Sequence, residues 1–155
     1  MTMQAFRFLS VLFAGSVLLA LGCGSETPSD EDPMVEGPPP ANLVGVWTYQ
    51  SVTVNGTPSS LADVLEWVPG AVRAELQLFE SSAFAYQEVN ESGAQLWSES
   101  GFVFFNDAGE VDVNVQMNSD GPADEMSTFT YTASGDTLTL SQVGGADAVV
   151  FTLVR

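Results

Sequence analysis

Strict alternation of apolar and polar residues is the feature that most limits how this 155-residue chain can fold. In residues 111–117, VDVNVQM, every second residue is apolar, so the three valines and Met117 share one face of an extended segment. A period of two fits a β-strand with one buried face and does not fit a helix, whose period is 3.6. Seven further runs show strand-like patterning. The eight predicted strands are residues 46–54, 72–79, 83–89, 95–105, 111–117, 128–132, 137–140 and 148–154.

Short turn signals separate these runs. Asn55-Gly56, Glu91-Ser92-Gly93 and Ser134-Gly135-Asp136 are typical of tight connections. Short connections favour antiparallel neighbours, and an even number of such strands can close, first against last, without exposed edges. We therefore expect an all-β fold, an eight-stranded antiparallel up-and-down barrel. A two-sheet sandwich satisfies the same pattern and is the alternative.

One segment, residues 60–68, breaks the β pattern. Its apolar residues Leu61, Val64, Leu65 and Val68 recur at helical spacing, and Pro69-Gly70 follows them. This spacing predicts a short amphipathic helix between the first two strands. Such a helix can act as a lid over a cavity or simply plug the core, and the sequence leaves both interpretations open.

The first 22 residues resemble a bacterial lipoprotein signal peptide. One positive charge, Arg7, precedes an apolar run from Phe8 to Leu21, which is shorter than the about 20 apolar residues of a membrane-spanning helix. Ala20-Leu21-Gly22-Cys23 resembles a lipobox, in which the cysteine is acylated and becomes the new N-terminus. The resemblance implies lipid attachment at Cys23, which is the only cysteine and so cannot form a disulfide within the chain.

Residues 23–42 follow as a polar segment rich in proline and acidic residues. Such a composition buries too little apolar surface to offset the entropy of ordering, so we expect a disordered tether between the acylated cysteine and a folded domain of residues 43–155. Gly24 stands after the cysteine where lipoprotein sorting signals place aspartate for inner-membrane retention. By that resemblance, we expect the protein in a bacterial cell envelope, lipid-anchored at the outer membrane and facing the periplasm.

The charge balance excludes several functions. Twenty acidic residues stand against three arginines, with no lysine or histidine, which gives a formal net charge of −17. Such a surface repels phosphate backbones, so we expect no nucleic-acid binding. Without an imidazole base or a Schiff-base amine, catalysis would need a carboxylate pair, and no pair stands out. We therefore expect a protein that is not an enzyme. An alternative use of the charge is capture or inhibition of a cationic envelope protein, such as a hydrolase.

We expect no cofactor and no metal. Residues 106–112, NDAGEVD, offer oxygen ligands suited to Ca²⁺ but lack the spacing of a calcium-binding loop. They fit a hairpin turn with Gly109 in the left-handed region. Zinc is disfavoured because the chain has no histidine and only one cysteine.

Both ends of the predicted domain resemble lipocalin-like (calycin) barrels. Leu43-Val-Gly-Val-Trp47 resembles the G-x-W start of the family, and the chain closes with residues 135–140, GDTLTL, and 150–155, VFTLVR. The resemblance implies that Trp47 lies at the closed end of the barrel and that Arg155 packs across its ring. Such a pair ties the first strand to the last.

An eight-stranded barrel is either filled by its own side chains or holds one small ligand. Aromatic residues in strands most often belong to the core, which is one interpretation of those found here. If a cavity is present, same-face aromatic pairs are the predicted wall, and a small hydrophobic ligand such as a fatty acyl chain is the predicted occupant. These pairs are Phe84 with Tyr86, Phe102 with Phe104, and Phe129 with Tyr131.

Overall fold

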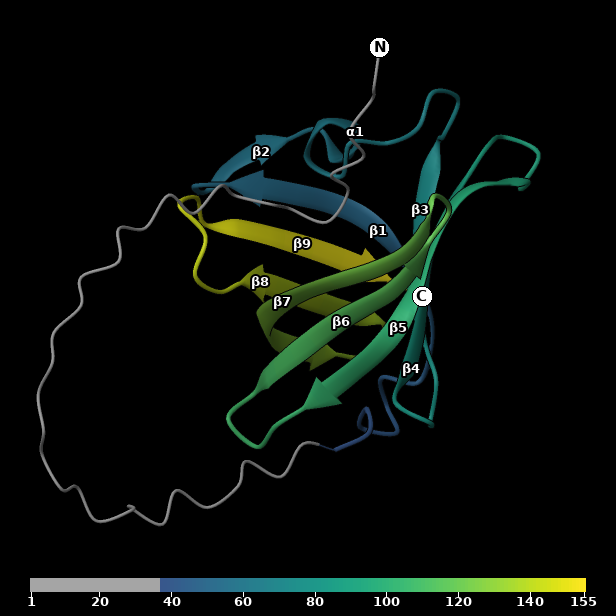
Figure 1. Ribbon diagram of the computed structural model, residues 1–155. Coiled ribbons are helices and arrows are strands. Elements are labelled where there is room, and N and C mark those ends of the chain that lie inside the picture. The colour runs from purple at the N-terminus through teal and green to yellow at the C-terminus, as the bar shows by residue number, and fades with distance from the viewer. Residues whose placement is uncertain (1–36) are drawn as a thin grey trace, which may run out of the picture.

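The computed structural model describes residues 37–155, which form one antiparallel sheet that closes on itself (Figure 1). The expected signal peptide, Cys23 and residues 24–36 of the expected tether lie outside the described residues. In chain order the elements are β1 (Gly45–Val54), β2 (Thr57–Ser59), α1 (Leu61–Val64), β3 (Arg73–Leu78), β4 (Ala83–Val89), β5 (Gln95–Phe105), β6 (Glu110–Asn118), β7 (Gly121–Ser134), β8 (Thr137–Gln142) and β9 (Val149–Val154).

β1 closes the barrel because its two halves pair with different neighbours. Residues 45–48 pair with β3, and residues 48–54 pair with β9 across a register shift at Gln50. From β3 to β9, each strand pairs with the next one along the chain. The eight strands β1 and β3 to β9 therefore form a closed antiparallel barrel, which confirms the fold predicted from the alternation. The sandwich alternative is wrong.

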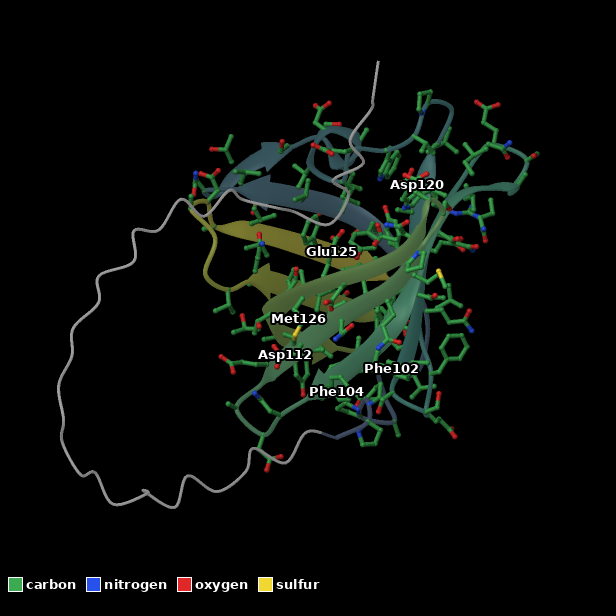
Figure 2. The ribbon with its side chains drawn as sticks, in the orientation of Figure 1. Phe102, Phe104, Asp112, Asp120, Glu125 and Met126 are labelled. Carbon is green, nitrogen blue, oxygen red and sulfur yellow. The ribbon has the colours of Figure 1, made fainter. Side chains whose placement is uncertain are left out.

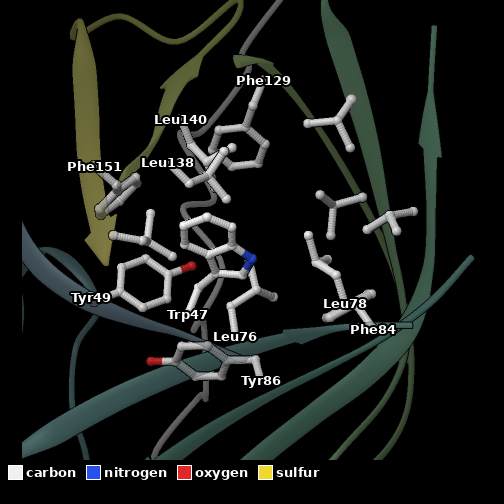
Figure 3. Close-up of a cluster of buried hydrophobic side chains, with 14 of the residues drawn as sticks. Trp47, Tyr49, Leu76, Leu78, Phe84, Tyr86, Phe129, Leu138, Leu140 and Phe151 are labelled. Atoms are coloured by element: carbon white, nitrogen blue, oxygen red, sulfur yellow. The ribbon is translucent and has the colours of Figure 1, made fainter. Parts of the chain in front are cut away.

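Apolar side chains fill the interior of this barrel. In β3, for example, Ala74, Leu76 and Leu78 are buried, while the residues between them are more exposed. Figure 3 shows aromatic and leucine side chains from several strands converging around the Trp47 indole. Each large apolar side chain that is fully buried contributes roughly 1.5–3 kcal/mol, so this interior supplies much of the stability of the barrel.

The helix between β1 and β3 is shorter than the sequence pattern predicts. We expected residues 60–68, but α1 spans only Leu61–Val64. Glu66 has a φ of 49°, in the left-handed region, which ends the helical geometry before Trp67. The apolar residues of the rest of the segment still face inward, and Leu65 is buried in the core.

β2 is a strand that the alternation did not reveal. Its three residues are all exposed, so they carry no pattern of burial. They pair with the end of β1 through a tight hairpin, in which Asn55 and Gly56 have φ angles of 53° and 77°. Two successive residues with positive φ are typical of the two-residue hairpin turn that Asn-Gly favours.

Met117 lies on the opposite face from the one predicted. Ser100 pairs with Met117 and Gly101 pairs with Val115, so Gln116 is an extra residue in β6. This bulge reverses the alternation, and the Met117 side chain is 50% exposed. Gly101 permits the close approach of the two strands here, because a Cβ at that position would lie 1.9 Å from the Asn114 carbonyl oxygen.

Residues 37–42, which we assigned to the tether, contact the barrel instead. The Gly37 N–H donates to the Phe105 carbonyl oxygen at 2.9 Å, and the Phe105 N–H donates back at 3.0 Å. Pro39 is buried, and Leu43 behind it is completely buried in the core. The segment therefore covers the end of the barrel at which β1 begins. Among residues 37–155, no helix has the length and apolar character needed to cross a membrane.

Candidate functional site

The contact that the lipocalin-like resemblance implies is present at the closed end of the barrel. Trp47 is completely buried, and its indole N–H donates to the Leu43 carbonyl oxygen at 2.8 Å. The central carbon of the Arg155 guanidinium lies 4.6 Å from the centre of the Trp47 ring. The Nε atom of Arg155 also lies 3.4 Å from a carboxylate oxygen of Asp136. The indole therefore joins the segment before β1 to the residue after β9.

An apolar cavity lies in the barrel interior. Its volume is about 40 Å³, and apolar side chains from α1 and from seven of the barrel strands line it. Val64 and Leu65 cover it from the α1 segment, and Tyr49 is its one lining residue with a polar side-chain atom. Because a water molecule needs roughly 10–15 Å³ of such volume, the cavity has room for about three waters or for a small apolar group.

Two of the six predicted wall residues line this cavity. Phe84 and Phe129 are buried and contribute to its surface. Tyr86 also points inward and is buried, but it does not border the cavity. Tyr131 is half-buried and packs edge-on against Phe105, with 5.0 Å between the ring centres. Tyr86 and Tyr131 therefore belong to the packed interior around the cavity.

Phe102 and Phe104, which we predicted in the wall, lie on the outer face of β5 (Figure 2). Phe102 is 39% exposed, and the two rings stack with their centres 6.5 Å apart. Val103 and Phe105 take the interior positions and border the cavity. The prediction is wrong because residues 102–105 are all apolar, so the pattern does not show which alternate pair faces inward.

The sequence did not reveal two buried glutamates in the interior. Glu88 is completely buried, where one carboxylate oxygen accepts from the Val68 N–H at 2.7 Å and the other accepts from the Tyr86 hydroxyl at 3.1 Å. Glu99 is also buried and accepts a hydrogen bond from the Trp97 indole at 3.3 Å. Alternation could have found Glu88, because it falls on the same face of β4 as Phe84 and Tyr86.

Burial, and to a smaller extent these carboxylates, raise the pKa values of two neighbouring tyrosines. Burial raises the pKa of Tyr49 above its usual value, and the charge of Glu99 raises it further. Burial also raises the pKa of Tyr86, with Glu88 as the next cause. Both phenols therefore stay protonated at neutral pH and can act as hydrogen-bond donors. The Tyr49 ring packs edge-on against Tyr86 and Phe151, which fixes its place in the cavity wall.

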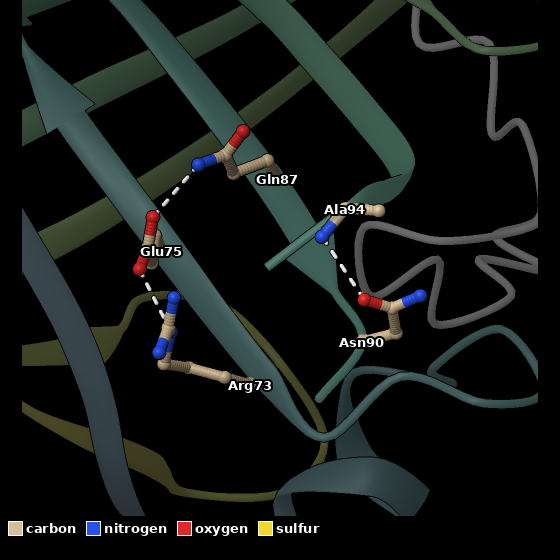
Figure 4. A network of polar contacts seen from close by, with 5 residues as sticks. All are labelled: Arg73, Glu75, Gln87, Asn90 and Ala94. Carbon is tan, nitrogen blue, oxygen red and sulfur yellow. Dashed lines mark hydrogen bonds and ion pairs between the residues drawn. The ribbon is translucent and has the colours of Figure 1, made fainter. Parts of the chain in front are cut away.

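The polar contacts on the outside of β3 and β4 are structural (Figure 4). The Nε atom of Arg73 lies 2.8 Å from one oxygen of Glu75, and the Gln87 amide donates to the other oxygen at 2.7 Å. In the turn after β4, the Asn90 side-chain oxygen accepts from the Ala94 N–H at 2.9 Å. These contacts order the surface and bring no catalytic group together.

Residues 106–112 form the hairpin turn that we favoured over a calcium site. The Asn106 side-chain oxygen accepts from the N–H groups of Ala108 and Glu110. Gly109 has a φ of 81°, in the left-handed region that this turn requires. Across the described part of the chain, no three His, Cys, Asp or Glu side chains are grouped in a way that could hold a metal ion.

Comparisons of the chain with protein-family models, with curated proteins and with solved structures find no match. The closed barrel is compatible with a lipocalin-like fold. The features that its own geometry offers for a function are a small apolar cavity, a short helix that borders it, and two buried carboxylates in the interior.

Proposed function

We propose that this protein is a lipid-anchored, lipocalin-like barrel that binds a small hydrophobic ligand in its interior and catalyses no reaction. The observation that carries the proposal is the interior cavity of about 40 Å³ with its apolar lining. Protein interiors are usually packed without voids of more than a water molecule, so an apolar void of this size favours a ligand over water.

The cavity volume limits the ligand. A fatty acyl chain, which we expected from the sequence, does not fit about 40 Å³ in full. The cavity can take a ligand of few atoms or the end of a longer chain. A longer ligand would need the α1 segment to move, because Val64 and Leu65 border the cavity there. The neutral Tyr49 hydroxyl would then be the nearest donor for a polar group on the ligand.

The lipid anchor is a proposal that rests on the sequence. The segment around Cys23 has the features of a lipobox, and acylation would place the barrel at a membrane of the bacterial envelope. Two or three acyl chains, at about 0.8 kcal/mol for each buried CH₂ group, hold a protein firmly in a bilayer. Metabolic labelling with a clickable palmitate analogue tests this. We expect label on the wild type and none on Cys23→Ser, and an unlabelled wild type would reject the anchor.

Titration of the protein with a series of straight-chain alcohols, followed by amide NMR, tests ligand binding. We expect saturable shifts at cavity residues, with the best affinity for the shorter alcohols. Leu140→Phe places a larger side chain in the cavity and should abolish binding. Val46→Phe adds the same ring on the outer surface, where Val46 is exposed, and should leave binding unchanged. Absence of saturable shifts in the wild type would reject the function.

A second candidate is an acidic module that captures or inhibits a cationic envelope protein. What favours it is that both arginines of residues 37–155 already lie beside carboxylates, Arg73 at Glu75 and Arg155 at Asp136. The remaining acidic surface is then uncompensated and would steer a basic partner toward the barrel. Pull-down of basic hydrolases at physiological salt tests it, and loss of all binding at that salt would reduce the effect to ion exchange.

A further inference from the structure

The first half of β7 leaves one edge of the sheet open. β7 pairs with β6 from Gly121 onward, but its pairing with β8 begins only at Phe129. The last backbone bond on the β8 side runs from the Val143 N–H to the Thr128 carbonyl oxygen at 2.9 Å. Among residues 37–155, no strand pairs with residues 121–127 on that side. The closed barrel therefore has a free edge, which the sequence did not predict.

The backbone groups on this edge are directed outward. In an antiparallel strand, the N–H and C=O of one residue point to the same side, and successive residues alternate. Because the Thr128 carbonyl points toward β8, the N–H and C=O of Met126 point to the same side, where no strand follows. Met126 is 66% exposed, so the described residues leave most of this position open to solvent. Such an edge is a template for an added strand.

The two faces of the edge differ in chemistry. Glu125 pairs with the buried Val115, so its side chain lies on the interior side of the sheet, whereas Met126 pairs with Asn114 on the outer side. An added strand would place alternate residues beside these two side chains. The residues of the added strand that face the interior side would lie beside the Glu125 carboxylate. Those that face the outer side would lie beside the Met126 side chain.

The outer side offers further apolar surface in the same row. Asn114 pairs with Met126 on one side and with Phe102 on the other. Phe102 is exposed and stacks on Phe104. Figure 2 shows Phe102, Phe104 and Met126 on the outer face of the sheet, with Asp112 labelled near them. An apolar residue next to Met126 would therefore extend an existing apolar surface with an acidic border.

We propose that residues 121–127 of β7, the open edge, bind an extended basic segment of a partner protein by strand addition. The charges select this occupant, because Asp120, Asp124 and Glu125 lie along the edge or in the turn before it. A second copy of the barrel would bring the same charges and be repelled. The chain's own residues 24–36 hold five acidic residues and no basic one, so they are repelled as well. This inference rests on the second candidate function, the capture of a cationic protein, and proposes the binding site for it.

A peptide of alternating lysine and valine is the probe, with glutamate in place of lysine as its control. Binding to the full-length protein is measured by fluorescence anisotropy at about 150 mM salt, where weak surface attraction is screened. We expect binding of the lysine peptide alone. Met126→Pro removes the outward N–H and is tolerated at a sheet edge, so it should weaken binding by about tenfold or more. Met126→Thr keeps that N–H and should stay within about threefold of the wild type.

Amide exchange in the wild type gives a readout that does not depend on a variant's folding. The lysine peptide should slow the hydrogen exchange of the Met126 N–H. A double variant, Asp124→Asn with Glu125→Gln, should bind the peptide more weakly, and its affinity should depend less on salt concentration. Equal binding by Met126→Pro, equal binding of both peptides, or an unprotected Met126 N–H would each overturn the proposal. If basic hydrolases still bind to Met126→Pro, the capture function stands and the strand-addition site is rejected.

Discussion

The two ends of the barrel are held together in different ways. At the closed end, the Trp47 indole packs in the core and donates a hydrogen bond to the Leu43 carbonyl oxygen. The Arg155 guanidinium lies over the indole ring. At the α1 end, a four-residue helix covers the cavity. Two hydrogen bonds fix the chain after that helix to β4, from the Val68 N–H to the Glu88 carboxylate and from the Val72 N–H to the Val89 carbonyl oxygen.

This difference suggests that the Trp47 end stabilises the barrel and that the α1 end gives a ligand access to the cavity. The contact between Trp47 and Arg155 joins residues that are far apart in the sequence, so it breaks only when the first and last strands of the barrel separate. The α1 segment packs its apolar side chains on the core, but the backbone bonds of residues 61–67 are local. Segments with few long-range backbone bonds open at a lower free energy than that of global unfolding. We therefore expect a ligand to enter beside α1 while the closed end stays intact.

Removal of the Trp47 side chain should have the largest effect. Trp47→Ala leaves a large cavity in the core and removes the platform for Arg155, which should cost roughly 3–5 kcal/mol of the free energy of unfolding. Urea denaturation measures the change. The matched variant at the α1 end is Trp67→Ala, whose indole is only partly buried and should cost less. Equal losses from the two variants would contradict the contrast between the ends.

Glu88 should have the next largest effect. Glu88→Leu leaves the Val68 N–H and the Tyr86 hydroxyl without this acceptor, which should cost roughly 1–3 kcal/mol. Faster amide exchange in residues 61–72 than in the rest of the barrel would localise the loss to the α1 end. Glu88→Gln keeps an acceptor oxygen and should cost less. If Glu88→Leu changes neither stability nor exchange, the carboxylate does not fasten the segment.

Arg155 should contribute less. Arg155→Ala removes a cation over the Trp47 ring, an interaction of about 0.5–2 kcal/mol. The Asp136 side chain is 80% exposed, so its ion pair with Arg155 is screened by solvent and Asp136→Asn should change little. Thermal unfolding of both variants separates the two contacts. A loss from Asp136→Asn as large as that from Arg155→Ala would mean that the ion pair, and not the ring contact, stabilises the closed end.

Tyr49→Phe should have the smallest effect at neutral pH. The pKa of Tyr49 is raised in the folded protein, so above pH about 10 its phenol ionises first in the unfolded chain. The folded state then binds more protons than the unfolded state, and stability falls as the pH rises. Tyr49→Phe should reduce this alkaline loss, as measured by urea midpoints at neutral and alkaline pH. An unchanged alkaline slope would show that Tyr49 does not titrate in this way.

The alternation in the sequence was enough to predict the closed barrel because one buried face imposes a period of two on every long strand. It was not enough where both faces are apolar, as at Phe102 and Phe104, or where a bulge shifts the phase, as at Met117. The three exposed residues of β2 leave no such pattern at all.

The sites were harder to predict than the strands. Trp47 and Arg155 were found through a family resemblance, and Phe84 and Phe129 as members of same-face aromatic pairs. Glu88 lies on the same face of β4 as Phe84, but the sequence analysis did not single it out, because glutamate is rarely buried. The free edge of β7 depends on where β8 stops pairing, and that is set by strand lengths that alternation does not define.

Native-state amide exchange of the full-length protein tests most directly whether the two ends differ as described. We predict that the N–H groups of Val68 and Val72 exchange through local opening, insensitive to low concentrations of urea. Those of the strand residues paired around Trp47 should exchange only through global unfolding, and a bound short-chain alcohol should slow exchange at Val68. Equal opening free energies at the two ends, with no effect of the alcohol, would contradict the account.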